Sequence, residues 1–75
     1  MINYAVAQRL RLIEFLLKNY GTVGRIEIAD YFGVSLPQAT RDFKQYSQLA
    51  PGNALYNKTS KRWVKSDTFK AVFNG

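Results

Sequence analysis

One short stretch of the sequence, residues 37–48, is rich in side chains that form directional hydrogen bonds. If it is helical, one arc carries only amides, cations, a hydroxyl and a proline: Pro37, Gln38, Thr40, Arg41, Lys44, Gln45 and Gln48. The arc holds no acid, whereas an ordinary solvent-facing helix mixes both signs of charge. A Gln amide pairs bidentately with adenine, and an Arg guanidinium with guanine O6 and N7. The arc therefore favours contact with nucleic-acid base edges, and the candidate readers are Pro37, Gln38, Thr40 and Arg41.

The same stretch carries the signals of a helix start that would position these side chains. Ser35 is the expected N-cap, and Gln38 completes a capping box if its amide reaches back to the Ser35 backbone. Pro37 then falls in the first turn, where its missing N–H costs no hydrogen bond. The opposite arc is apolar, with Asp42 at its flank, and consists of Leu36, Ala39, Phe43, Tyr46 and Leu49. We predict a helix over residues 35–48 with one buried and one exposed arc.

Two further helices are predicted before this one. The first runs from about Tyr4 to Asn19, because apolar residues recur there at helical spacing, namely Val6, Leu10, Ile13, Leu17 and Tyr20. The second spans residues 25–32, and Gly21 and Gly33 are suited to the left-handed conformation that ends a helix. Leu12 and Phe15 are apolar but lie outside the stripe by which the first helix packs into the core. They are covered either by the wing or the C-terminal residues, or by another subunit or domain.

Residues 54–65 predict a β-hairpin with a polar, basic loop at 58–61. Leu55 alternates with Asn57, and Trp63 is expected in the hairpin core rather than on a base-stacking surface. Two strands alone are marginally stable, so Thr22–Val23 is expected to add a third. Beyond the hairpin, residues 69–73 have the apolar spacing of a helical turn that folds back on the body or leads to a further segment.

Composition excludes several classes of function. The absence of Cys and His removes thiolate or imidazole metal sites and Ser-His or Cys-His catalysis. The acids lie scattered on different predicted elements and offer no acid–base pair. We therefore expect no catalytic residue, no metal and no cofactor, and a protein that is not an enzyme. The most apolar run, residues 10–17, is interrupted by Arg11 and Glu14 and is too short to span a bilayer, so no membrane partner is expected.

The net charge of +6 is concentrated in the second half of the chain. Residues 41–75 hold seven cations against two acids, a net charge of +5, whereas residues 1–40 contribute +1. Such a basic surface favours a polyanionic partner. The order of elements predicts a mostly α fold with a small β-hairpin, a winged helix-turn-helix of three helices and a two- or three-stranded wing sheet. We expect one domain over residues 1–75.

The motif DYFGVSLPQATRDFKQY, residues 30–46, resembles the helix-turn-helix of DeoR-type bacterial repressors. Together with LAPGNALYN at residues 49–57 and the later Trp-Val strand, it is more similar still to the N-terminal winged helix of WYL-domain transcriptional regulators. The resemblance implies a cytoplasmic, nucleoid-associated repressor that binds double-stranded DNA as a homodimer on a palindromic operator. Those regulators continue into a ligand-sensing WYL domain, so this chain is expected to be either the N-terminal fragment of a longer regulator or a small free-standing protein.

In that architecture helix 35–48 enters the major groove, and wing 54–65 contacts the backbone or the minor groove. The expected phosphate contacts are Arg25, Ser35, Lys44, Gln45, Lys58, Lys61 and Arg62. Two candidate base-reading residues have an alternative role. The Gln38 amide is the one that would complete the capping box, and Arg41 is placed to form an ion pair with Asp42 or Glu14. The alternative function is a protein-interaction scaffold without DNA readout. RNA binding is less favoured, because stacking aromatics are not evident on the basic face.

Overall fold

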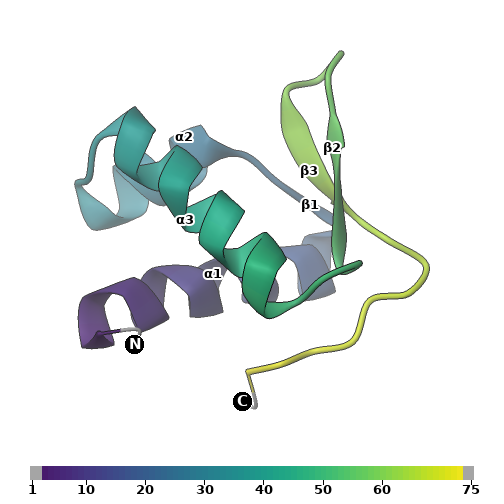
Figure 1. Ribbon diagram of the computed structural model, residues 1–75. Coiled ribbons are helices and arrows are strands. Elements are labelled where there is room, and N and C mark those ends of the chain that lie inside the picture. Colours follow the sequence, from purple (N-terminus) through teal and green to yellow (C-terminus); the bar gives the residue numbers. More distant parts are fainter. Residues whose placement is uncertain (1–2, 74–75) are drawn as a thin grey trace.

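The computed structural model describes residues 3–73, which form three helices and a three-stranded sheet (Figure 1). Along the chain the elements are α1 (Tyr4–Tyr20), β1 (Thr22–Val23), α2 (Arg25–Phe32), α3 (Leu36–Leu49), β2 (Ala54–Asn57) and β3 (Arg62–Lys65). The helices pack against one another, and the hairpin of β2 and β3 stands beside them with its tip directed away from α1. The predicted winged helix-turn-helix is confirmed.

The helix ends follow local chemistry. The Asn3 side chain caps α1 by accepting a hydrogen bond from the Val6 N–H at 2.8 Å. Gly21 at φ 79° ends α1, and Gly33 at φ 67° ends α2. Both glycines adopt the left-handed conformation, which is costly for a residue with a Cβ. These stops, predicted from sequence, set the short connections that turn α1 into β1 and α2 into α3.

The sheet has the strand order β1-β3-β2, with both pairs antiparallel. The dipeptide Thr22–Val23 is therefore the predicted third strand, with Val23 opposite Trp63. Tyr56 is also opposite Trp63, and these two rings lie 5.3 Å apart on the helix-facing side. Strand neighbours point to opposite faces, so Leu55 faces outward and is exposed. The alternation of Leu55 with Asn57 did not identify Tyr56 as the residue that packs with Trp63.

The core contains ten buried apolar side chains among the described residues: Leu10, Ile13, Leu17, Val23, Ile28, Ala29, Ala39, Phe43, Tyr46 and Ala50. Three residues expected on buried arcs are instead 41%, 42% and 71% exposed, namely Leu36, Leu49 and Tyr20. Each is the first or last residue of its helix. Asp42, expected at the flank of the apolar arc, is 1% exposed.

Residues 69–73 form no helical turn, contrary to the prediction, but residues 66–73 do run back along the body toward α1, as one alternative had predicted (Figure 1). Asn53 binds both backbone groups of Lys70, accepting from its N–H at 2.9 Å and donating to its carbonyl at 2.8 Å. The Glu14 carboxylate accepts from the Val72 N–H at 2.9 Å and the Phe73 N–H at 2.7 Å. Buried side chains therefore supply the partners that a helix would have supplied internally.

Tyr46 links these two anchoring residues. Its hydroxyl donates to Glu14 at 2.8 Å and accepts from the Asn53 amide at 3.1 Å. Burial raises the pKa of the Tyr46 hydroxyl above its ordinary value; the Asn53 hydrogen bond opposes this shift, and the Glu14 carboxylate adds to it. We call Glu14, Tyr46 and Asn53 the tail anchor.

The returning tail reaches the outer side of α1 but covers it only in part. The Arg11 guanidinium lies 5.2 Å from the centre of the Phe73 ring. Phe73 and Phe15 line one shallow hollow there, yet Phe15 is 53% exposed while Leu12 is half-buried. Contact of this side with another subunit or domain therefore stays a prediction.

Candidate nucleic-acid interface

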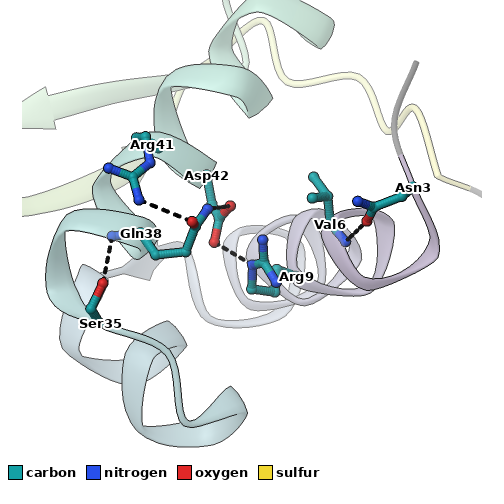
Figure 2. Close-up of polar contacts among 7 residues, drawn as sticks. All are labelled: Asn3, Val6, Arg9, Ser35, Gln38, Arg41 and Asp42. Atoms are coloured by element: carbon teal, nitrogen blue, oxygen red, sulfur yellow. Dashed lines mark hydrogen bonds and ion pairs between the residues drawn. The ribbon is translucent and has the colours of Figure 1, made fainter.

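The exposed arc of α3 begins at a well-formed helix start. The Ser35 hydroxyl accepts from the Gln38 N–H at 3.1 Å, and Pro37 lies in the first turn, as predicted (Figure 2). The capping box, however, is not completed. The Gln38 side chain turns toward Asp42 instead of back toward the Ser35 backbone, because the buried Asp42 carboxylate is a stronger acceptor for its amide.

Three of the four predicted base readers, Pro37, Thr40 and Arg41, are exposed on one side of α3, and Gln38 is half-buried beside them. Gln38 donates to Asp42 at 3.1 Å and accepts from Arg41 at 3.0 Å. The alternative of an Arg41 ion pair with Asp42 or Glu14 is not realised. Those carboxylates lie with Arg9 and with the tail anchor, respectively, which leaves most of the Arg41 guanidinium facing solvent.

The exposed arc of α3 carries no acid. Asp42 is the single acid of α3, and its carboxylate accepts from the Arg9 guanidinium on α1 at 2.6 Å, where both residues are buried. Because a buried ion pair presents little field to solvent, the exposed part of α3 is positive only. Arg41 and Lys44 supply its two charges.

The predicted phosphate-contacting residues come from three elements. Arg25 at the start of α2, Ser35, Lys44 on α3 and the wing residues Lys58 and Lys61 are exposed, while Gln45 is half-buried. Within residues 3–73 the ion pairs involve only Arg9 and Arg62. The exposed cations of α2, α3 and the hairpin loop therefore carry no carboxylate partner within the described part of the chain.

Arg62 differs from the rest of this set. Its guanidinium forms an ion pair with Glu27 of α2, and its Nε donates to the Thr22 hydroxyl at 3.0 Å. Glu27 also accepts from the Gly24 N–H at 3.0 Å, closing the first turn of α2. A Cβ at Gly24 would lie 3.1 Å from the Arg62 guanidinium, so the glycine leaves room for the link. Arg62 ties the wing to α2, and this use was missed from the sequence.

A hollow of about 300 Å³ lies where α2, α3 and the wing meet. It is lined by three aromatic residues, two cations and a threonine, namely Phe43, Tyr56, Trp63, Arg25, Lys61 and Thr40. Trp63 stacks on the core residue Phe43 with ring centres 5.5 Å apart, as expected of a core tryptophan. Tyr56 is 49% exposed, so an aromatic ring does lie on the basic side, contrary to the expectation. We call the exposed residues Arg25, Pro37, Thr40, Arg41, Lys44, Lys58 and Lys61 the recognition face.

Neither a metal site nor a membrane element is seen in the described part of the chain. Residues 3–73 hold no group of three or more His, Cys, Asp or Glu side chains close enough to share an ion. Among the same residues, no helix combines the length and apolar character needed to cross a bilayer.

Comparison with known proteins places the chain in a family. Residues 5–75 match the model of the BrxR transcriptional regulator winged helix-turn-helix domain. The chain is 36% identical over 66 residues to the DNA-binding transcriptional repressor CapW of Pseudomonas aeruginosa, and 35% identical over 66 residues to CapW of Escherichia coli strain KTE188. Each match covers 88% of this chain but 22% of the relative.

A third relative, CapW of Stenotrophomonas maltophilia, is 28% identical over 71 residues, which cover 95% of this chain and 24% of the relative. The chain thus spans about a quarter or less of the length of these proteins. The resemblance to the N-terminal winged helix of WYL-domain regulators is confirmed. The chain belongs to the BrxR family of transcriptional-regulator winged helix-turn-helix domains.

Proposed function

We propose that this chain binds double-stranded DNA sequence-specifically and acts as the DNA-binding part of a bacterial transcriptional repressor. One observation carries the proposal: Arg25 of α2, Thr40 of α3 and Lys61 of the wing line a single hollow, and the exposed arc of α3 beside it has no acid. The relatives named DNA-binding transcriptional repressors support it. An enzymatic role has no comparable support.

In the proposed complex the N-terminal half of α3 lies in the major groove, which is ~12 Å wide and accepts a helix. Arg41 faces the base edges, and Pro37 and Thr40 contact thymine methyl groups. The Ser35 hydroxyl and the exposed N–H groups of the helix start bind a phosphate. Gln38, assigned by sequence to an adenine, is already hydrogen-bonded within the protein.

The backbone contacts follow from the hollow. Its aromatic floor of Tyr56 and Trp63 suits the apolar side of deoxyribose, and Arg25 and Lys61 suit the phosphates on either side. Lys58 extends these contacts along the wing, while Lys44 and Gln45 meet phosphates one turn beyond the readers. Arg62 takes a different role from the one first predicted, since its ion pair with Glu27 holds the wing in place.

One domain of this size reads only a half-site, so specific repression requires two copies. We propose a palindromic operator with half-sites about 10 bp or a multiple apart, bound in the cytoplasm on nucleoid DNA. The dimer contact lies either in the parts of the relatives that this chain does not span or on the Leu12 and Phe15 side of α1.

Selection of bound sequences from a random duplex library tests the proposal directly. We expect enrichment of a defined motif, and loss of its binding in the triple variant Gln38→Ala/Arg41→Ala/Lys44→Ala. The variant should still show a cooperative unfolding transition, at lower stability because Asp42 loses the Gln38 hydrogen bond. The matched control, Arg11→Ala/Lys18→Ala, removes one Arg and one Lys from α1 instead, an equal loss of charge, and should bind DNA as the parent does. A folded domain that enriches no sequence and retains no duplex would favour the interaction scaffold.

A further inference from the structure

A series of hydrogen-bonded side chains connects the interior of the domain to the outer side of α3 (Figure 2). Arg9 of α1 donates to Asp42 Oδ2 at 2.6 Å, and the Gln38 amide donates to Asp42 Oδ1 at 3.1 Å. Arg41 Nη2 then donates to Gln38 Oε1 at 3.0 Å. Solvent exposure of the side chains rises along this series: Arg9 and Asp42 are buried, Gln38 is half-buried and Arg41 is exposed.

Donor and acceptor chemistry determines how the Gln38 amide is oriented. An ionised Asp carboxylate only accepts hydrogen bonds and an Arg guanidinium only donates them. The amide nitrogen must therefore face Asp42, and the amide oxygen must face Arg41. The opposite orientation would place two acceptors together at Asp42 and two donors together at Arg41. The partners on both sides thus select the same orientation.

This orientation makes Gln38 a poor reader of adenine. Bidentate pairing with adenine requires the amide oxygen and an N–H of the same amide to face the base together. Here the nitrogen points inward to a carboxylate that is 1% exposed. Turning the amide outward would leave an oxygen of the buried Asp42 without its donor, which is costly. The same bonds hold Arg41, whose remaining N–H groups stay free to pair with a base.

We propose that Arg41 reads a guanine in the bound duplex, and that Gln38 and Asp42 are positioning residues that orient its guanidinium. The inference rests on the proposed function and names the base that the α3 surface selects. Holding the long Arg41 side chain before binding lowers the entropy lost in the complex. Arg9 anchors the arrangement by compensating the charge of Asp42 in the interior.

Purine analogues test the assignment. In the duplex selected from the random library, each guanine is replaced in turn by 7-deazaguanine and each adenine by 7-deazaadenine, which removes only the N7 acceptor. We expect 7-deazaguanine at one position of the half-site to weaken binding about tenfold, the scale of one lost base contact. We expect no such effect of 7-deazaadenine at any position near it.

Two variants separate positioning from general stability. Arg41→Met keeps the length of the side chain but has no donor for guanine, so the 7-deazaguanine effect should vanish while the phosphate contacts still hold the duplex. Gln38→Met keeps the side-chain length but forms none of the hydrogen bonds, so it should reduce the guanine preference several-fold. The matched control Gln48→Met, exposed in the last turn of α3, should leave the preference unchanged.

The results that overturn the inference are distinct from failure of the proposed function. Sensitivity to 7-deazaadenine that disappears in Gln38→Met would assign the readout to Gln38. Full guanine preference in a folded Arg41→Met variant would show that another residue reads the guanine. An unchanged guanine preference in a folded Gln38→Met variant would remove the positioning role. A domain that selects no duplex at all would overturn the proposed function and this inference together.

Discussion

Two polar regions on different sides of this small domain use their hydrogen-bonding groups in opposite ways. In the tail anchor, Glu14, Tyr46 and Asn53 find their partners within the chain, and Glu14 and Asn53 also bind backbone groups of the returning C-terminal residues. On the recognition face, Arg25, Lys44, Lys58 and Lys61 are exposed without a carboxylate partner in the described part of the chain.

The tail anchor should therefore contribute to the stability of the fold, and the recognition face to DNA binding. A buried polar group stabilises the fold only when its partners are present, and it is costly when one is removed. An exposed, unpaired cation contributes little to stability but remains available to a polyanion. Variants of the tail anchor should therefore change unfolding and leave DNA affinity intact, and variants of the recognition face should do the reverse.

The largest effect is expected for Glu14→Ala. The substitution leaves the Tyr46 hydroxyl and the N–H groups of Val72 and Phe73 without their acceptor. Urea denaturation should show a loss of about 3 kcal/mol, since each unsatisfied buried group costs about 1–3 kcal/mol. Duplex affinity of the folded fraction should match that of the parent. A loss below about 0.5 kcal/mol would contradict the account of the anchor.

Removing the wing cations tests the other region. Lys58→Ala/Lys61→Ala should lower the slope of log K against log salt by about 2 and weaken binding about 60-fold at 0.1 M salt, on specific and non-specific duplexes alike. The free energy of unfolding should not change, because both side chains are exposed. Arg11→Ala/Lys18→Ala is the control with equal charge loss. An identical response of the two pairs would show that net charge, not the recognition face, governs binding.

Alkaline pH should act on the tail anchor. Because burial raises the pKa of Tyr46 in the folded state, the folded protein retains a proton that the unfolded chain loses above its ordinary pKa of about 10. Its contribution to stability is complete below that pH and falls by about 1.4 kcal/mol per pH unit above it. Denaturation between pH 9 and 11 measures the slope. The slope should be smaller in Tyr46→Phe and unchanged in Tyr31→Phe, a substitution at an exposed tyrosine.

The smallest effect is expected where the two properties meet, at Ser35. Its hydroxyl caps α3 and lies on the exposed side of the helix start. Ser35→Ala should reduce the free energy of unfolding by about 1 kcal/mol and should weaken DNA binding slightly. Ser35→Asp, which restores the cap with a negative charge, should recover stability but bind DNA less well than Ser35→Ala. Equal DNA binding by the two variants would remove the proposed phosphate contact.

Much of the fold follows from local sequence signals. Gly21, Gly33 and Ser35 mark helix boundaries through conformations and hydrogen bonds set within a few residues. Apolar residues at helical spacing predicted most of the core. Thr22–Val23 was predicted as the third strand because a hairpin alone is marginally stable. The motif at residues 30–46 was sufficient for the resemblance that the family match confirms.

The buried polar contacts did not follow from the sequence, because they join residues far apart in the chain. Arg9 and Asp42 are 33 positions apart, and Glu14 and Phe73 are 59 apart. Periodicity within one helix shows that Glu14 lies near an apolar stripe, but not that a tail segment will bring two N–H groups to it. Gln38 and Asp42 are only four positions apart, but the ion pair that accompanies Asp42 in the interior comes from Arg9 on another helix.

Salt dependence of duplex binding tests the central claim most directly, namely that unpaired cations of the recognition face neutralise DNA phosphates. Four exposed cations are assigned to phosphates and have no carboxylate partner within residues 3–73, namely Arg25, Lys44, Lys58 and Lys61. At about 0.9 per phosphate, fluorescence anisotropy over a range of salt concentrations should give a slope of log K against log salt of about −3.6. A slope near zero on the selected duplex would contradict the account.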